Sequence, residues 1–345
     1  MTIRRRTKLI LAAPAVFIVG VIAAQELPPP DLSELFPLSH VSTPTDPEAF
    51  RLNATSDLVL LDVSVKDAKG GFVSGLIQDK FKIFDNNKQT PVTVFRAGDI
   101  PVTVGLVVDN SGSMRAKRPE VVTAALTFVT ESNPNDELFV VNFNDHVSLG
   151  LPRLTQFTSD KEALRTALLR NPVRGRTALD DALKIALEHL DKGHKDRKTL
   201  VLISDGGDNA SDTTEREIVH LAEEKLVTIY TVGIFDADDQ DKNPKFLERI
   251  ARLTGGECYL PKKLDEMVAV CSKIAKDIRS RYVVGFSPEE SALNGQARKL
   301  RVVAEPPPGI SKVVVRSRTS YIAAKRAPTH QHTEAEERPR SGKPQ

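Results

Sequence analysis

The most constraining feature of this sequence is a regular alternation of apolar runs with helix-patterned segments between residues 101 and 279. Runs such as 102–108 and 199–204 are apolar and β-branched enough to be strands that are buried on both faces. Between such runs, segments such as 121–129 and 178–190 carry apolar residues at helical spacing. This alternation predicts an α/β fold with a mainly parallel, doubly wound sheet that helices cover on both faces.

The same pattern assigns the other elements of this region. The expected strands are 102–108, 138–143, 199–204, 227–232 and an edge strand at 258–260, with 147–151 as a short antiparallel neighbour of 138–143. The expected helices are 121–129, 161–169, 178–190, 214–224, 244–253 and 264–279. Ser211-Asp212 is the expected cap of helix 214–224. Pro244 suits the first turn of its helix, and Gly255-Gly256 suits the end of that helix.

The segments on either side of this region have the pattern of short strands. The expected strands before it are 58–65, 81–84 and 92–95, with a turn at 85–88. The expected strands after it are 282–286, 300–304 and 312–316. Each flank is too small to bury a core of its own. We therefore expect the flanks 50–98 and 281–325 to pair into one small β-sandwich, with an α/β domain at 99–280 inserted between them.

The amino terminus has the pattern of an export signal. Basic residues from Arg4 to Lys8 precede an uncharged apolar run of 16 residues from Leu9 to Ala24, with small residues at its end. A membrane span needs about 20 residues, so a cleaved signal peptide at 1–24 is favoured, and an uncleaved membrane anchor stays open. Residues 25–49 have the composition of a linker, and 326–345 that of a disordered tail. The protein is therefore expected to be exported, as a periplasmic, cell-surface or secreted protein.

Composition limits the class of partner, and it leaves open whether the two cysteines form a disulfide. The chain has 48 Lys and Arg against 46 Asp and Glu, only 5% aromatic residues and no basic stripe, which argues against nucleic-acid binding. Cys258 and Cys271 are the two cysteines. In an exported protein they either pair as a disulfide or stay apart as small buried side chains.

Oxygen-bearing side chains gather on three predicted loops. Asp109, Ser111 and Ser113 follow strand 102–108, Thr177 precedes a helix, and Asp205 follows strand 199–204. Open α/β sheets bind ligands at the carboxyl ends of their strands, which is where these loops are expected. Two carboxylates and three hydroxyls can hold Mg²⁺ (or Mn²⁺) and leave one position for a ligand. Taken singly, the Ser and Thr residues can equally be helix caps, and Asp205 a turn residue.

At these residues the sequence closely resembles the von Willebrand factor type A domain. The metal-ion-dependent adhesion site of that family is Asp-x-Ser-x-Ser with a distant Thr and a distant Asp, and all five residues are present here. The resemblance implies that Ser111, Ser113 and Thr177 contact the metal directly, and that the two Asp bind it directly or through water. Phe143-Asn144 and residues 230–234 are similar to further family features.

The flanks resemble those of a bacterial subgroup of exported proteins with this domain. The resemblance rests on Asp62-Val-Ser-Val-Lys-Asp67 before the domain and on Arg316-Ser-Arg-Thr-Ser-Tyr321 after it. No known activity comes with this looser likeness.

The resemblance implies a non-enzymatic module that binds a protein ligand through an exposed Asp or Glu, with no small-molecule cofactor. Asn110, Asn144 and Arg176 are the expected rim residues that face this partner. One alternative is an envelope scaffold whose metal is structural or absent. A Mg²⁺-dependent phosphatase is disfavoured, because Ser111 stands where the second, acid/base Asp is needed and no His lies near the three loops in the sequence.

Overall fold

The computed structural model describes residues 58–235 and 242–325, which belong to one compact unit, Thr55–Gln345. The predicted signal peptide, the linker, residues 50–57 and the predicted tail lie outside the described residues. Within the described ranges, no helix is long and apolar enough to cross a membrane.

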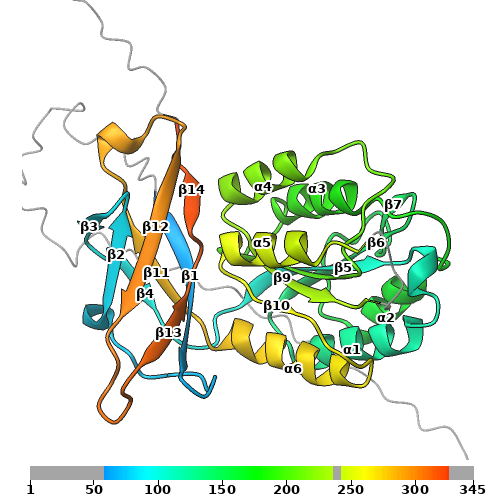
Figure 1. The fold of residues 1–345 in the computed structure, drawn as a ribbon, viewed down its shortest axis with the longest axis horizontal. Coiled ribbons are helices and arrows are strands. Elements are labelled where there is room, and N and C mark those ends of the chain that lie inside the picture. The colour runs from blue at the N-terminus through cyan, green and yellow to red at the C-terminus, as the bar shows by residue number, and fades with distance from the viewer. Residues whose placement is uncertain (1–57, 236–241, 326–345) are drawn as a thin grey trace, which may run out of the picture. The chain divides into compact units, whose positions relative to one another are not determined.

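A six-stranded sheet forms the centre of the α/β region, Val102–Arg279, as predicted (Figure 1). Its strands in spatial order are β10 (Cys258–Tyr259), β9 (Thr228–Gly233), β8 (Arg197–Ser204), β5 (Val102–Asp109), β6 (Glu137–Phe143) and β7 (Val147–Leu149). All neighbouring pairs are parallel except β6 and β7, which are antiparallel. Every residue of β5 is buried, which explains its largely apolar sequence.

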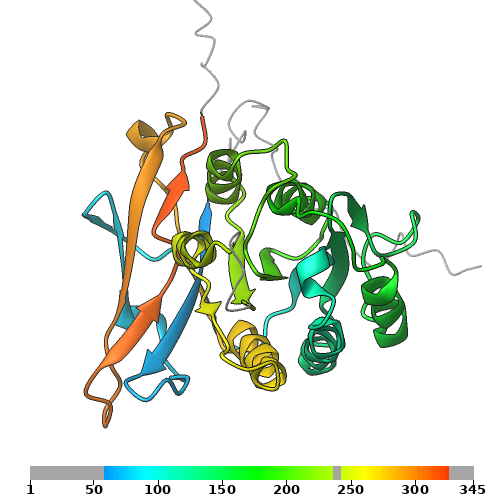
Figure 2. The same ribbon diagram turned by 45° about the vertical axis from the view of Figure 1, so that its right-hand side comes forward.

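Helices cover both faces of this sheet. They are α1 (Arg118–Glu131), α2 (Lys161–Leu169), α3 (Leu179–Leu190), α4 (Glu215–Glu224), α5 (Pro244–Thr254) and α6 (Glu266–Arg279). Figures 1 and 2 show α3, α4 and α5 on one face and α1, α2 and α6 on the other. The sheet is therefore doubly wound, as the sequence predicts.

The ends of two helices test the predicted caps. Helix α5 begins with Pro244 and ends at Gly255, which has a left-handed φ of 81°, as expected. The expected cap of α4 at Ser211-Asp212 is wrong. Thr214 is the N-cap, and it forms a capping box with Glu217 that satisfies two backbone donors at once.

The flanking strands form two antiparallel sheets, here called the flanking sandwich. One sheet has the order β13 (Val313–Arg316), β1 (Val59–Asp67), β11 (Tyr282–Phe286) and β4 (Val94–Arg96). The other has the order β14 (Ser320–Ile322), β12 (Ala297–Ala304), β2 (Phe81–Asp85) and β3 (Lys88–Thr90). Both sheets combine strands from before and after the α/β region, which confirms the predicted pairing of the flanks.

Two short strands, β3 and β14, were not predicted from the sequence. Strand β3 lies after a two-residue turn in which Asn86 and Asn87 have φ values of 46° and 68°. Asn tolerates this left-handed conformation, which matches the twist of a tight hairpin. The predicted turn therefore closes a hairpin between β2 and β3. None of the three residues of β3 is buried, so this strand lacks the apolar alternation that marks a strand.

A buried ionic cluster centred on Asp277 joins the flanking sandwich to the α/β region. The Asp277 carboxylate accepts hydrogen bonds from Ser64 Oγ at 2.7 Å, from Arg281 Nη2 at 3.1 Å and from the hydroxyl of Tyr230. Lys66 Nζ of β1 lies 3.2 Å from the same carboxylate. The Asp277 and Arg281 side chains are each 1% exposed. Opposite charges and polar hydrogens therefore compensate the burial of this carboxylate.

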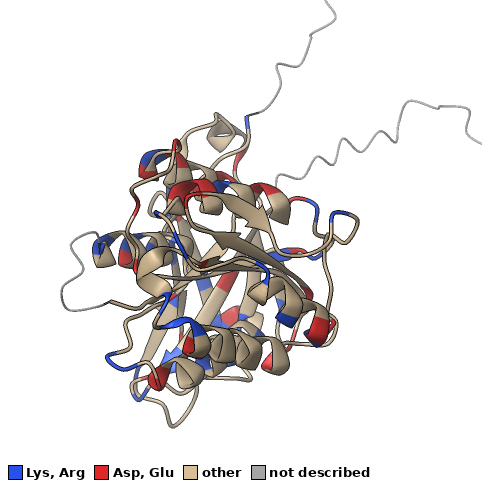
Figure 3. Ribbon diagram, turned by 90° about the vertical axis from the view of Figure 1, so that its right-hand side faces the viewer, with Lys and Arg blue, Asp and Glu red and all other residues tan. Residues whose placement is uncertain are grey.

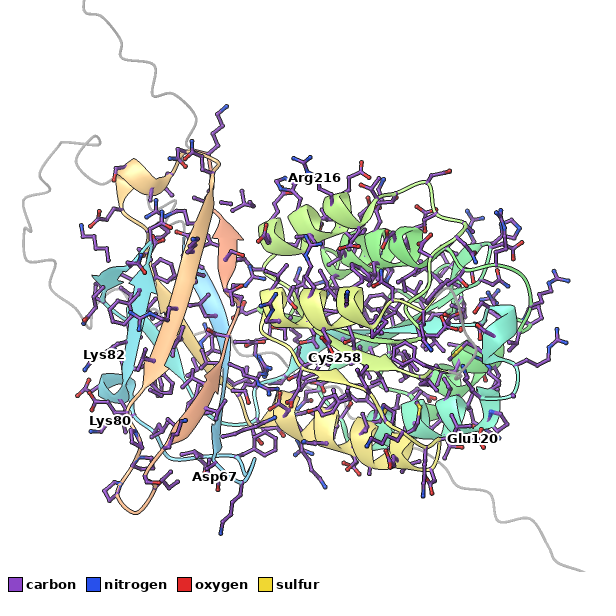
Figure 4. The ribbon with its side chains drawn as sticks, viewed as in Figure 1. Asp67, Lys80, Lys82, Glu120, Arg216 and Cys258 are labelled. Carbon is purple, nitrogen blue, oxygen red and sulfur yellow. The ribbon has the colours of Figure 1, made fainter. Side chains whose placement is uncertain are left out.

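The two cysteines are free thiols. Cys258 lies on β10 at the edge of the sheet, where Figure 4 labels it, and is half-buried. Cys271 is buried in α6, and burial raises the pKa of its thiol to about 12. Of the two alternatives that the sequence left open, the structure has the unpaired one.

Replacing Asp277 by Ala should destabilise the fold strongly. The substitution leaves the buried Arg281 without the carboxylate that it pairs with, whereas Lys66 keeps its ion pair with Glu257 at 2.7 Å. Removing one partner of a buried ion pair typically costs about 3–5 kcal/mol of unfolding free energy. Urea unfolding followed by circular dichroism measures this loss. The matched control is Asp79→Ala, which removes an exposed carboxylate and should change stability by less than about 0.5 kcal/mol. Equal losses in the two variants would contradict a stabilising role of the cluster.

The stability that Asp277 contributes should depend on acid pH. Burial opposes its ionisation, but the charges of Arg281 and Lys66 outweigh burial and hold the pKa of Asp277 well below its usual range. This contribution is complete above the unfolded pKa of about 3.9 and is lost as pH falls toward the folded pKa. The stability difference between wild type and Asp277→Asn should therefore shrink below about pH 4. Urea midpoints at several acid pH values test this, and a constant difference would contradict it.

Candidate metal site

The three predicted loops meet at the carboxyl edge of the central sheet. Figure 3 looks onto this end of the α/β region, where basic and acidic segments are interspersed. The parallel register places Asp109 of β5 opposite Phe143 of β6, and Val108 opposite Ile203 of β8. Strands β5 and β8 therefore end at nearly the same level, which brings Asp109 close to Ser204 and the loop that follows it.

Asp109 is fully buried, and both of its carboxylate oxygens accept hydrogen bonds. Oδ1 accepts the backbone N–H of Ser111 at 2.8 Å, and Oδ2 accepts the hydroxyl of Ser204 at 2.6 Å. The Ser204 hydroxyl also accepts the N–H of Gly206 at 3.0 Å. Ser204 thus links the Asp109 loop to the loop after β8 and fixes the orientation of the carboxylate.

Hydroxyl hydrogen bonds connect Ser111 and Ser113 to the second carboxylate. The two Oγ atoms lie 3.1 Å apart, and Ser113 Oγ donates to Asp205 Oδ2 at 2.6 Å. Ser111 and Asp205 are buried, whereas Ser113 is exposed. Ser111, Ser113 and Asp205 are therefore linked by their side chains. Asp109 joins this set through Ser204, the residue before Asp205.

Thr177 is positioned by backbone contacts with the loop after β8. Its carbonyl accepts the N–H groups of Asn209 at 3.0 Å and Ala210 at 3.1 Å, and its own N–H donates to Asn209 Oδ1 at 2.9 Å. On the other side of the site, Gly112 N–H donates to the carbonyl of Gly175 at 3.0 Å. The Thr177 loop is thereby joined to both other loops.

The alternative that these hydroxyls serve as helix caps does not describe them. Ser111 precedes only a single 3₁₀ turn, Gly112–Met114, and makes no side-chain cap bond. The N-cap of α3 is Ala178, which follows Thr177 and has no capping side chain. Asp205 has some turn character, because its Oδ1 accepts the N–H of Gly207 at 3.4 Å.

The site concentrates negative charge in a poorly solvated position. Burial, followed by the nearby Asp205 carboxylate, raises the pKa of Asp109 to about 7, against the opposing effect of hydrogen bonds from Ser204 and Ser111. A divalent cation would stabilise two such neighbouring carboxylates. The donor set of two carboxylates and three hydroxyls fits a hard cation. The described ranges contain no group of three or more His, Cys, Asp or Glu placed to hold a metal. At the candidate site, hydroxyl oxygens would therefore have to complete the set of metal ligands.

The structure corrects the predicted partner-facing rim. Asn110 is 0% exposed, with its Nδ2 donating to Asn142 Oδ1 at 3.0 Å and its Oδ1 accepting from Arg118. Asn144 is also buried, and its Oδ1 accepts the N–H of His146. The Asn110 amide bonds other side chains and the Asn144 amide holds loop backbone, so both are used inside the protein and neither faces a partner. Arg176 is exposed, and its Nη1 donates to the carbonyl of Asn209 at 3.2 Å.

Several positioning residues were missed from the sequence. Ser204 directly precedes Asp205 at the strand end, so its place in the sequence was a usable signal. Arg118, Asn142 and Asn209 carried no such signal, because their roles depend on contacts across the fold. His146 follows the strand end of β6, but its side chain is 88% exposed and lies 3.8 Å from Asp145.

The chain is similar in sequence to known proteins. The family model of the von Willebrand factor type A domain matches residues 104–207. The uncharacterized protein sll0103 of Synechocystis sp. is 29% identical over 160 residues. This alignment covers 46% of the present chain and 37% of that protein.

Two solved structures are also similar. A von Willebrand factor type A protein from Catenulispora acidiphila is 16% identical, with a TM-score of 0.47, over 71% of this chain and 73% of that chain. Proximal thread matrix protein 1 of the mussel byssus, with a zinc-occupied adhesion-site motif, is 20% identical, with a TM-score of 0.43, over 52% of this chain and 48% of that chain.

Replacing Gly175 by Ala should weaken Mg²⁺ binding in addition to straining the backbone. Gly175 has a φ of 81°, and an added Cβ would lie 2.3 Å from Asp145 Oδ1. The left-handed conformation costs an L-residue about 1–2 kcal/mol. Strain here should also shift the carbonyl that holds Gly112 and so weaken Mg²⁺ binding, measured by calorimetric titration. Gly309→Ala is the control, because its φ is 86° and no atom lies within 4 Å of the added Cβ. Similar Mg²⁺ affinities in both variants would contradict this link.

Proposed function

We propose that this protein is an exported, divalent-metal-dependent binding module whose site coordinates an acidic residue of a protein partner. Asp109, Ser111, Ser113, Thr177 and Asp205 would hold Mg²⁺ or Mn²⁺. When bound, the ion supplies an electrophilic position that accepts a carboxylate oxygen. The von Willebrand factor type A domain is generally a protein-binding and usually non-catalytic module, which supports this class of function.

One observation carries the proposal, namely the hydrogen bond from Ser113 Oγ to Asp205 Oδ2. It joins residues 92 positions apart in the sequence and brings a hydroxyl and a carboxylate from the loops after β5 and β8 to one point. A cap or a turn residue has no reason to make such a contact. A shared ligand at the carboxyl edge of the sheet accounts for it.

The chemistry of the site favours binding over catalysis. Asp109 is followed at the second position by Ser111, which is a poor general acid or base at neutral pH. The basic residue Arg176 is exposed beside Thr177 and is suited to contact an acidic partner. The basic amino terminus with its apolar run supports export to the periplasm, the cell surface or the medium.

The proposal is tested first with the metal alone. Calorimetric titration of the protein with Mg²⁺ and Mn²⁺ should give saturable heat, and Asp109→Ala should weaken the affinity at least about tenfold. The matched control is Asp79→Asn, which neutralises an exposed carboxylate of the flanking sandwich and should leave the affinity unchanged. Absence of heat and of a shift in melting temperature would favour the alternative of a scaffold without a functional metal.

The partner is tested next, by capture from the native cell envelope with and without EDTA. Proteins that are retained only without EDTA, and that Asp109→Ala fails to retain, are the expected partners. Binding that is insensitive to EDTA and to this substitution would contradict recognition through the metal.

A further inference from the structure

A pocket lies beside strand β7, apart from the residues of the candidate metal site. It has a volume of about 330 Å³ and is formed by β6, β7, the loop 150–156 and the end of α3. Its wall includes the apolar side chains of Phe139, Leu149 and Leu151. Leu149 is 38% exposed, so a ligand in this pocket would remove apolar surface from water.

Three basic side chains line the same pocket, and no lining residue is acidic. Arg170 Nη1 donates to the carbonyls of Gly150 at 3.2 Å and Leu151 at 3.3 Å, which holds its guanidinium at the pocket. The exposed side chains of Arg153 and Lys192 have no hydrogen bond or ion pair with the described parts of the chain. The pocket thus has positive charge that the surrounding side chains leave uncompensated.

The inner wall of the pocket is rigid and neutral. His189 packs against Phe139 with a ring-centroid distance of 4.5 Å and against Phe157 at 5.1 Å. Its Nε2 lies 3.0 Å from the carbonyl of Gln156, an acceptor that requires a proton on this nitrogen. Burial lowers the pKa of His189, and the positive charge of Lys192 lowers it further, against the effect of the Gln156 hydrogen bond. His189 is therefore an uncharged aromatic wall.

We propose that this pocket binds a small organic anion with a compact apolar body. The apolar wall would hold the body, and Arg153, Arg170 and Lys192 would hold the anionic group. The volume lies at the lower end of the range of about 300–1,000 Å³ for ligand pockets, which suits a molecule of one or two rings. This site is independent of the proposed metal-dependent function, because it shares no residue with it.

Binding of 1-naphthylacetate to the full chain, measured by calorimetry with EDTA present, tests the proposal. Saturable binding is expected, and the uncharged 1-naphthylacetamide should bind at least about tenfold more weakly, because it cannot pair with the three cations. A parallel titration with 1-naphthyl phosphate determines which anionic group the pocket prefers. Asp109→Ala should bind like the wild type, which separates this site from the metal site. Equal binding of the acid and the amide, or no saturable binding of either anion, would overturn the proposal.

Substitutions of the cations locate the site. A partly exposed ion pair contributes up to about 1 kcal/mol, which is about a fivefold change in affinity, so Lys192→Gln and Arg153→Gln should each weaken binding by up to about fivefold. Arg165→Gln is the matched control, because Arg165 is an exposed residue of α2 that does not line the pocket. Leu149→Glu places a negative charge in the pocket and should abolish anion binding. Unchanged melting temperatures show that the variants fold, and unchanged affinity in all three pocket variants would overturn the assignment.

Discussion

The parallel pairing of β5 with β6 and β8 is the constraint on which the candidate site depends. In a parallel ladder with this register, consecutive strands end at one edge, so the residues that follow them come together without any local signal of their own. Asp109 and Ser204 meet for this reason, and Asp205 follows one residue later. Helices on both faces make the sheet rigid. The geometry of the three loops is therefore set by the buried core and not by the loops themselves.

The flanking sandwich depends on a similar long-range condition. Neither flank has enough apolar residues for its own core, but β1 pairs with β11 and β13, and β2 pairs with β12. The combined core includes Phe81 and Tyr282, whose ring centroids lie 5.1 Å apart. The Asp277 cluster then connects this core to α6 and β9. Folding of the flanks thus requires the residues on both sides of the α/β region.

Much of this architecture could be predicted from the sequence, because burial leaves a direct mark on composition. The central strands are buried on both faces and the helices are amphipathic, so their types and approximate limits follow from apolar spacing alone. The exposed strand β3 left no such mark, and Thr214 was missed as a cap because Ser211-Asp212 offered the same chemistry two to three residues earlier. Local patterns therefore located the elements better than their ends.

The candidate donors could be named from the sequence, but the residues that support them could not. Asp109, Ser111, Ser113, Thr177 and Asp205 were proposed because residue type and loop position agree. The structure brings their three loops together, and their binding of a metal stays a prediction. Asn110 and Asn144 were misassigned to the rim, because an amide on a loop looks the same in sequence whether it faces solvent or forms hydrogen bonds inside the protein. Arg118 could not be predicted as a support either, because an arginine near a loop is expected in solvent. In the structure it donates to the Asn110 side chain and to the carbonyl of Leu168. Such roles become visible only when the partners are known.

The insertion of the α/β region into the flanking sandwich has a mechanical consequence. The chain enters this region from β4 and leaves it from α6 into β11, and β4 and β11 are hydrogen-bonded neighbours in one sheet. A pulling force on the carboxyl edge of the central sheet would therefore be transmitted to the sandwich through two covalent connections, β4 to β5 and α6 to β11, which share the load. These connections end on adjacent antiparallel strands, and the Asp277 cluster holds α6 and β1 together beside them. Tension would thus be carried by a doubled attachment, so that neither connection bears the whole force.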